Sequence, residues 1–304
     1  MSNLTIIGAG PSGLTAAIYA LRAGLEVTIC ESNMYGGQTS VINTVENYPG
    51  FESISGIELA ESMYNQVLKL GGKFIFSRVI KVDLEGTDKK VYLKDGTELI
   101  SKAVVVASGL KQRLLNCKGE KEFIGRGVSY CATCDGSFFK NKDVAIVGGG
   151  NTALEDALYL SNICNKVYMI VRKDHFRGER FLTKSISKKS NIIVKFETQI
   201  DEIKGDTAVR SVVLKQHDAT SEILNIEGVF IAIGYEPECQ MYAGQIDMDK
   251  NGYFISNENC ETNLKGVYVA GDCRVKSLRQ IVTAVSDGAI CGNKSAEYVF
   301  SSEL

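Results

Sequence analysis

The sequence of 304 residues has only two histidines and one Cys-x-x-Cys pair, formed by Cys131 and Cys134. A structural zinc site would need two further ligands at a matching spacing. Since the chain has no second pair of this kind, the sequence argues against zinc and favours a reversibly formed disulfide. Of the nine cysteines, the other seven show no regular spacing, which is typical of proteins in a reducing compartment.

The chain also lacks an excess of charge, with 34 basic and 36 acidic residues and a net charge of -2. A strong basic excess is typical of proteins that bind nucleic acid or anionic membranes, and no apolar run is long enough to span a membrane. We therefore expect neither nucleic acid nor a membrane as a partner. The first predicted strand begins at Leu4, which leaves no room for a signal peptide, so we expect a cytoplasmic protein.

What the chain does contain is an internal repeat, seen when residues 4–31 are aligned with residues 144–171. Both copies read as a strand, a glycine-rich loop, a helix and a second strand. One glycine of such a loop permits the tight turn, a second lets a pyrophosphate approach the backbone, and the helix N-terminus faces its negative charge. The repeat predicts two nucleotide loops, which contain Gly8, Gly10, Pro11, Ser12 and Gly13 in the first copy and Gly148, Gly150, Asn151, Thr152 and Ala153 in the second.

Other elements follow from the apolar patterns between and after the two copies. The sequence predicts a hairpin over 89–99, strands over 103–107, 192–196 and 211–215, apolar strands within 228–237 and 266–272, and a helix over 279–300. With 44% hydrophobic residues, the chain can bury enough apolar surface for two domains.

The residue that ends the second strand of each copy indicates which nucleotide each fold would bind. Glu31 ends the first, where a carboxylate accepts hydrogen bonds from ribose hydroxyls and repels a 2′-phosphate, as suits FAD. In the second copy this position is followed by Arg172, Lys173 and Arg177, whose charges suit the 2′-phosphate of NADPH. The alternative is that these three cations are simply a solvated surface.

Two further segments suit a flavin. Asp272 follows a strand and Gly271, where its carboxylate can accept from a ribityl hydroxyl or cap the next turn. Gly36 lies in a flexible loop just after the first fold, and Gln38 in the same loop carries an amide that could reach a flavin ring.

The dithiol lies just before the second glycine loop and well after the first. Cys131 and Cys134 can close a reducible disulfide, and the adjacent Asp135 can carry the proton that thiol and thiolate exchange. Two nucleotide sites together with a dithiol predict an electron relay, and hence a disulfide reductase.

With these motifs in place, the chain resembles the low-molecular-weight thioredoxin reductases over almost its full length. The resemblance rests on the two glycine loops, Gly-Gly-Gln at 36–38, Asn-Tyr-Pro-Gly-Phe at 47–51, the segment 127–136 with Cys-Ala-Thr-Cys-Asp, Gly-Asp at 271–272 and Arg-Gln at 279–280. It implies an α/β protein with two Rossmann-like, three-layer ββα nucleotide-binding domains, the second inserted into the first. The expected segments are 1–115 and 244–304 for the FAD domain and 116–243 for the NAD(P)H domain, which carries the dithiol.

The resemblance also implies cofactors, partners and roles for individual residues. FAD would be bound by Gly8, Gly10, Pro11, Ser12, Gly13, Glu31, Gly36, Gln38, Asn47, Gly109, Asp272, Arg279 and Gln280, and NADPH by the second glycine loop with Arg172, Lys173 and Arg177. Cys134 would face the flavin, Cys131 would attack the disulfide of thioredoxin, and Asp135 would act as acid and base. The enzyme would be a homodimer whose middle domain rotates about hinges near 116–120 and 237–244.

Two departures from the family pattern leave the electron donor open. The basic motif of the family is His-Arg-Arg-x-x-x-Arg, whereas this chain has Val171, Arg172 and Lys173 before Arg177. A lysine keeps the charge but loses the planar guanidinium fork. In addition, Cys117 stands where relatives often have proline ahead of Gly-Glu. The alternative function is therefore a thioredoxin reductase of the same fold that takes electrons from ferredoxin.

Other classes fit the sequence less well. A glutathione or lipoamide type of reductase would carry its cysteines in the first domain, a ferredoxin-NADP reductase would lack them, and a peroxiredoxin-coupled reductase would carry an N-terminal extension. A redox sensor without catalytic activity would have lost a cysteine, Asp135 or a glycine loop, and all of these are present.

Overall fold

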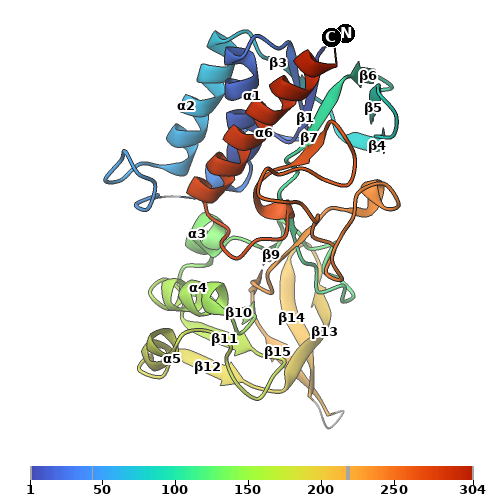
Figure 1. Cartoon of the computed structure of the whole chain (residues 1–304). Helices are drawn as coiled ribbons and strands as arrows, with labels where there is room; N and C mark the ends of the chain where they lie inside the picture. The colour runs from blue at the N-terminus through green and yellow to red at the C-terminus, as the bar shows by residue number, and fades with distance from the viewer. Residues whose placement is uncertain (1, 43, 217–219, 303–304) are drawn as a thin grey trace. The chain divides into compact units, whose positions relative to one another are not determined.

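The computed structural model describes residues 2–42, 44–216 and 220–302 (Figure 1). The chain divides into two compact units: unit 1 comprises Met1–Lys111 and Glu236–Leu304, and unit 2 comprises Gln112–Tyr235. The second unit is thus inserted into the first, as expected. The middle segment was expected at residues 116–243, whereas unit 2 begins and ends a few residues earlier, at Gln112 and Tyr235.

Unit 1 is built on a parallel sheet with the strand order β18-β7-β1-β2-β3. The strands are β1 (Leu4–Ile7), β2 (Val27–Glu31), β3 (Lys73–Phe76), β7 (Ala103–Val106) and β18 (Val267–Val269). The last of these, from the C-terminal segment, pairs with β7 through Val267 and Val104. The FAD-type fold is therefore completed by residues from both ends of the chain.

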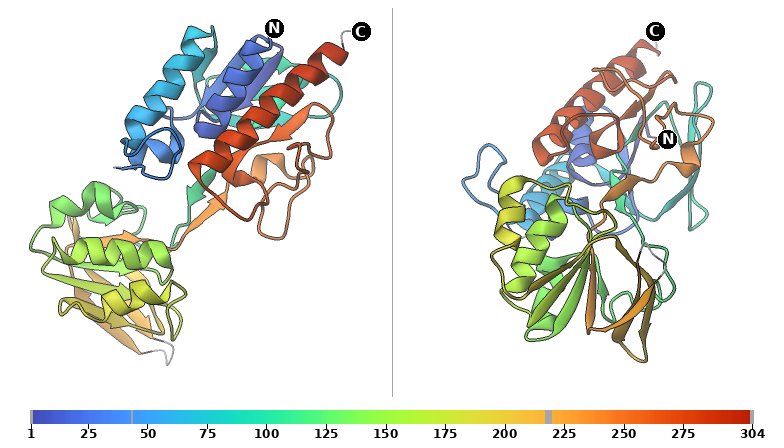
Figure 2. Two further views of the ribbon diagram at one scale, coloured as in Figure 1. Left: turned by 60° about the vertical axis from the view of Figure 1, so that its left-hand side comes forward. Right: turned by 90° about the horizontal axis from the view of Figure 1, so that it is seen from below.

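Three helices cover one face of this sheet, with α1 (Pro11–Arg22) between α2 (Gly56–Lys69) and α6 (Ile281–Ser301) (Figures 1 and 2). Close packing of α6 on α1 depends on two glycines of α6. A Cβ at Gly288 would lie 2.3 Å from the Ser12 carbonyl oxygen, and one at Gly292 would lie 2.5 Å from that of Ala16. A larger residue at either position would force the two helices apart, because the backbone oxygen opposite cannot move aside as the end of a flexible side chain can.

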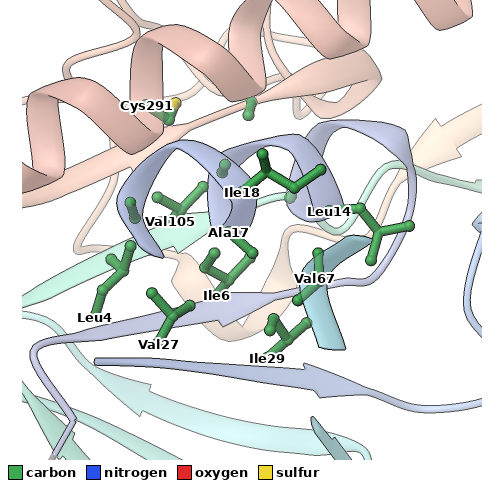
Figure 3. Close-up of a cluster of buried hydrophobic side chains, with 14 of the residues drawn as sticks. Leu4, Ile6, Leu14, Ala17, Ile18, Val27, Ile29, Val67, Val105 and Cys291 are labelled. Carbon is green, nitrogen blue, oxygen red and sulfur yellow. The ribbon is translucent and has the colours of Figure 1, made fainter. Parts of the chain in front are cut away.

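Alternation along the strands of unit 1 explains its layers. Leu4 and Ile6 point toward α1 and pack with Leu14 and Val67 (Figure 3), whereas the intervening positions face the other side of the sheet. On that side lies an antiparallel sheet of β4 (Val79–Asp83), β5 (Lys89–Leu93) and β6 (Glu98–Ser101). Each fully buried aliphatic side chain in these layers stabilises the fold by about 1.5–3 kcal/mol.

Unit 2 repeats this three-layer arrangement. Its parallel sheet has the order β12-β11-β10-β16-β9, formed by β9 (Val128–Ser129), β10 (Asp143–Val147), β11 (Lys166–Ile170), β12 (Ile192–Lys195) and β16 (Gly228–Ile231). Helices α4 (Asn151–Ser161) and α5 (Arg180–Ile186) pack on one face, and the antiparallel strands β13 (Thr198–Gly205), β14 (Val209–Gln216) and β15 (Ser221–Asn225) on the other. The predicted pair of Rossmann-like, three-layer folds is confirmed.

The sequence predicted most strands of the two parallel sheets, the 89–99 hairpin and the C-terminal helix. It missed α2 and the short helices α3 (Ala132–Asp135) and α5. The apolar run within 228–237 is also interrupted: β16 ends at Ile231, and a separate strand, β17 (Tyr235–Pro237), pairs with β8 (Leu110–Gln112) in a two-stranded sheet. The break coincides with Gly234, whose φ of 94° is incompatible with a continuous strand.

Candidate functional site

The first glycine loop joins β1 to α1 and is held by close backbone contacts. A Cβ at Gly8, where φ is 106°, would lie 2.3 Å from the Ala107 carbonyl oxygen, and one at Gly13 would lie 1.9 Å from that of Gly8. Gly10 caps α1 without any side-chain hydrogen bond, and the first turn contains no acidic residue. The first amides of α1 therefore remain available to a phosphate.

A cavity of about 820 Å³ opens beside this loop, entirely within unit 1. It is lined by eleven of the residues predicted for FAD, namely Gly8, Gly10, Pro11, Ser12, Glu31, Gln38, Asn47, Gly109, Asp272, Arg279 and Gln280. Gly13 and Gly36 do not line it, and both are closely packed: a Cβ at Gly36 would lie 2.5 Å from that of Ala60. The cavity size is within the range of cofactor sites.

Glu31 is held at the edge of this cavity by hydrogen bonds to its carboxylate. Its Oε2 accepts from the Ala9 amide at 2.8 Å, and its Oε1 accepts from the Asn33 amide at 3.0 Å and from the Ser32 hydroxyl at 3.2 Å. These contacts fix the acid at the end of β2, where the sequence predicted a ribose partner.

Asp272 provides the clearest test of whether the cavity fits FAD. Its Oδ1 is buried and has no hydrogen-bond partner in the described part of the chain, and burial raises the pKa of this carboxyl. An orphaned buried acceptor is costly unless a donor completes it, and a ribityl hydroxyl is such a donor. The Ser108 hydroxyl, which also lines the cavity, is a second buried group without a described partner.

Side chains from distant segments close the same cavity. The Arg279 guanidinium stacks on Tyr253 at 4.2 Å and donates to the Asp272 carbonyl at 3.1 Å. Asn47 donates to Gln280 at 3.1 Å. The residues present therefore fit FAD. Sequence reasoning missed Ser108, Thr39, Lys111 and Glu238 among the lining residues; for Ser108 the signal was present, since it directly follows a predicted strand.

The dithiol lies in unit 2, at the start of α3. Cys131 and Cys134 form a disulfide with their Cα atoms 5.3 Å apart. Cys131 is the N-cap of α3, and its Sγ accepts a hydrogen bond from the Cys134 amide at 3.2 Å. The Cys131 amide in turn donates to Ser129 Oγ at 3.1 Å. Cys131 is half-buried and Cys134 is exposed.

Asp135 directly follows the dithiol and is oriented by Ser129, which precedes the dithiol in the chain. Its Oδ2 accepts a hydrogen bond of 2.6 Å from the Ser129 hydroxyl, and its amide donates to the Cys131 carbonyl at 3.1 Å. A carboxylate fixed next to the dithiol in the chain is a candidate for exchanging protons with it.

The second glycine loop, between β10 and α4, repeats the geometry of the first. Gly148 has a φ of 147°, and a Cβ there would lie 2.3 Å from the Ala232 carbonyl oxygen. Gly150 caps α4 without a side-chain hydrogen bond, and Ala153 is fully buried. The Asn151 side chain is engaged by Glu179, with which it exchanges hydrogen bonds at 2.8 and 3.0 Å.

The three predicted phosphate-binding cations lie beside this loop. The Arg177 amide donates to the Gly149 carbonyl at 2.7 Å, which ties the basic segment to the glycine turn. Arg172, Lys173 and Arg177 are all exposed, and their side chains make no ion pair within the described residues, whereas the nearby Asp174 pairs with His175. The cations thus remain available to an anion.

Two of the remaining cysteines, Cys30 and Cys164, have the character of inert packing residues. Burial raises the pKa of Cys30 to about 12 and that of Cys164 to about 11, so neither forms the reactive thiolate at neutral pH. Among the described residues, no group of three His, Cys, Asp or Glu side chains is placed to hold a metal ion. No helix in the described part of the chain is long and apolar enough to cross a membrane.

Comparison with known proteins agrees with this combination of fold and dithiol. Residues 2–288 match the family model of the pyridine nucleotide-disulphide oxidoreductases. This chain therefore belongs to that family of pyridine nucleotide-disulphide oxidoreductases.

Within the family, the similar proteins include thioredoxin reductases. The thioredoxin reductase of Peptoclostridium acidaminophilum is 40% identical over 98% of this chain and 96% of its own length. A structure of Lactococcus lactis thioredoxin reductase has a TM-score of 0.88 at 35% identity and covers 99% of this chain and 100% of its own. The chain is thus a member of the thioredoxin reductase family, which confirms the resemblance.

One structural relative bears on the electron donor. A ferredoxin-flavin thioredoxin reductase from Clostridium acetobutylicum has a TM-score of 0.55 at 28% identity and covers 99% of this chain and 98% of its own. The fold is therefore shared by reductases of more than one type.

Proposed function

We propose that this protein is an NADPH-dependent thioredoxin-disulfide reductase with FAD as its resident cofactor. The proposal rests on the composition of unit 2, which holds the Cys131–Cys134 disulfide. The same unit contains a dinucleotide loop followed by three cations that form no salt bridge with the described acidic residues. A dithiol and an NADPH-type site on one unit, with a flavin-type cavity on the other, match the parts of the predicted relay.

Different residues of unit 1 would bind different parts of FAD. The first amides of α1 would bind the FAD pyrophosphate, Glu31 the adenosine ribose and Asp272 the ribityl chain, since each offers a hydrogen-bonding group of the required type. When bound, FAD would supply two-electron chemistry between the nicotinamide and the disulfide. Gln38 and Arg279 would shape the cavity around it.

The dithiol residues would then transfer the electron pair to thioredoxin. The Cys131 thiolate attacks one sulfur of the thioredoxin disulfide, that S–S bond breaks, and the departing sulfur takes up a proton. Cys134 next attacks Cys131, which restores the Cys131–Cys134 disulfide and releases the second thioredoxin thiol. The dithiol is oxidised, thioredoxin is reduced, and Asp135 is placed to exchange the protons.

In the second fold, the amides at the start of α4 would bind the NADPH pyrophosphate. Arg172, Lys173 and Arg177 would bind the 2′-phosphate, because they are exposed cations that follow the position equivalent to Glu31 of the first fold. This group distinguishes NADPH from NADH and is the reason to prefer NADPH as the donor.

Ferredoxin remains the second candidate donor. The observation in its favour is the structural similarity to the ferredoxin-flavin reductase, together with the replacement of one arginine of the basic motif by Lys173. Against it stand the second glycine loop and the free cations, which a ferredoxin-dependent enzyme would have no need to keep. We further propose that the enzyme is a cytoplasmic homodimer, for which analytical ultracentrifugation is the test of assembly.

The first experiment is an anaerobic titration of the purified yellow protein. One sample receives one equivalent of NADPH and another receives reduced ferredoxin, and the flavin absorbance is followed. Rapid bleaching by NADPH supports the proposal, whereas bleaching by ferredoxin alone would make ferredoxin the donor. Addition of oxidised thioredoxin should then restore the absorbance.

A further inference from the structure

Glu120 is a buried carboxylate whose described partners are three neutral donors. It is only 1% exposed. Its Oε1 accepts from the Leu115 amide at 2.8 Å and from the Tyr130 hydroxyl at 2.9 Å, and its Oε2 accepts from the Asn116 amide at 2.7 Å. Burying a carboxylate without a cationic partner destabilises the folded protein. The three hydrogen bonds offset this cost and fix the positions of the three donors around Glu120.

One of these donors belongs to the residue just before the dithiol. Tyr130 is held at two points: its hydroxyl donates to Glu120, and its carbonyl accepts from the Gln112 side chain at 3.2 Å. Its aromatic ring also packs against the apolar core of unit 2. The backbone that leads into Cys131 therefore has a fixed direction.

The backbone direction at Tyr130 leads directly into Cys131, whose sulfur has a hydrogen-bond donor beside it. With Tyr130 in place, Cys131 Sγ lies 3.2 Å from the Cys134 amide. A sulfur that carries negative charge is stabilised by such a donor, and a more stable thiolate is present at a higher fraction at neutral pH. The orientation of Cys131 is thus linked to the reactivity of its thiol.

The other two donors to Glu120 come from the chain just after the crossing into unit 2. Gln112 is the first residue of that unit, and Leu115 and Asn116 follow it. The same carboxylate therefore joins the incoming segment and the dithiol segment, and residues 112–120 all belong to unit 2.

We propose that Tyr130, acting through Glu120, is a positioning residue that holds Cys131 in the orientation from which it attacks the thioredoxin disulfide. This inference rests on the proposed function, since it assigns a role within that reaction. It differs from a purely structural role, in which Tyr130 and Glu120 would stabilise unit 2 without affecting the chemistry of Cys131.

The test uses the FAD-loaded enzyme with Tyr130→Phe, which removes one hydroxyl and keeps the ring. The dithiol is reduced with dithiothreitol, the reductant is removed anaerobically, and the rate of Cys131 alkylation by iodoacetamide is followed by fragment mass spectrometry. We expect Cys131 to react about three- to tenfold more slowly at neutral pH, the effect of losing one hydrogen bond. Turnover of thioredoxin should fall by a similar factor, with the KM for NADPH unchanged.

Two further variants sharpen the result. Tyr168→Phe is the matched control, because Tyr168 is a half-buried tyrosine of the same unit that packs on the same core; it should alkylate and turn over like the wild type. Combining Glu120→Gln with Tyr130→Phe should slow Cys131 no further than the slower single variant, since both act through one contact.

The outcomes separate this inference from the proposed function. Wild-type alkylation and turnover in Tyr130→Phe, even with a lower melting temperature, would overturn the positioning role. Failure of the wild-type enzyme to reduce thioredoxin would refute the proposed function instead. The alkylation measurement needs no thioredoxin, so it decides the orientation of Cys131 in either case.

Discussion

The Ser129 hydroxyl donates a hydrogen bond of 2.6 Å to the carboxylate of Asp135, so the residues on either side of the dithiol are joined directly. Ser129 also accepts from the Cys131 amide at 3.1 Å. The serine thus contacts both Cys131 and Asp135, the predicted acid of the dithiol. Sequence reasoning identified Asp135 but gave Ser129 no role.

Replacement of Asp135 by asparagine should slow the reduction of thioredoxin by about a hundredfold, because the amide cannot carry the proton. FAD content, measured by absorbance, should stay at the wild-type level, since the flavin-type cavity lies in unit 1. Ser129→Ala is the milder comparison and should cost no more than about tenfold, the effect of one hydrogen bond. Wild-type turnover by Asp135→Asn would exclude this aspartate as the proton carrier.

Cys134→Ser should retain the flavin but lose disulfide reduction, because the serine hydroxyl cannot close the bond to Cys131. The measurement is a thioredoxin-coupled assay beside a flavin spectrum. Replacement of Cys239, which lies in the other unit and makes no disulfide, should leave turnover unchanged. Normal thioredoxin turnover by Cys134→Ser would refute the relay.

Arg177→Ala should raise the KM for NADPH by about tenfold, which corresponds to loss of one charge-assisted hydrogen bond to phosphate. NADH lacks the 2′-phosphate, so its KM should not change. Lys184→Ala, which removes an exposed cation in the last turn of α5, is the control for a general charge effect. Equal effects on NADPH and NADH would show that Arg177 does not bind the 2′-phosphate.

Asp287→Asn should lower the stability of unit 1 by about 3 kcal/mol, because it breaks a buried ion-pair cluster. The Asp287 carboxylate accepts from Arg274 at 2.9 Å, from Lys276 at 2.7 Å and from the Gly271 amide at 3.0 Å. A thermal melt should show the loss, and the variant should release FAD more readily, since Gly271 precedes Asp272. Asp206→Asn, at an exposed pair with Arg210, should change the melting temperature little.

Asp156→Asn should stabilise the protein at pH 8 but not at pH 4. Burial, with a smaller contribution from Glu155, raises the pKa of Asp156 from 3.8 to about 6. The folded protein therefore binds this proton more tightly than the unfolded chain, so the charged carboxylate costs stability as pH rises through this range and stays costly above it. The asparagine should recover about 1–2 kcal/mol at pH 8. An equal effect at both pH values would contradict the assignment.

Much of the fold was predictable because its signals are local. The apolar periodicity of 4–31 and 144–171 identified both copies of the repeat, and β1, α1, β10 and α4 follow it closely. The helix α2 was missed although Ser55 and Glu58 form a capping box at its start. That signal was present in the sequence and was not used.

The candidate site was also predicted in part. Eleven predicted residues line the cavity of unit 1, because glycine turns and strand ends mark them in the chain. Gly13 and Gly36 do not line the cavity, and their close packing depends on atoms that the fold brings near. Glu120 had no signal as a partner of Tyr130, since hydrogen bonds between buried groups leave no periodic pattern.

The sequence by itself determined the repeated nucleotide fold, the dithiol with its acid and the basic segment, since turn glycines, strand periodicity and adjacent residue types are properties of neighbours in the chain. Only the tertiary structure decided that Asp287 holds Gly271, that the incoming segment is tied to the dithiol through Glu120, and where the chain crosses between its units. These relationships join residues through burial and distance, and a buried polar group takes whichever partner the packed layers bring within reach.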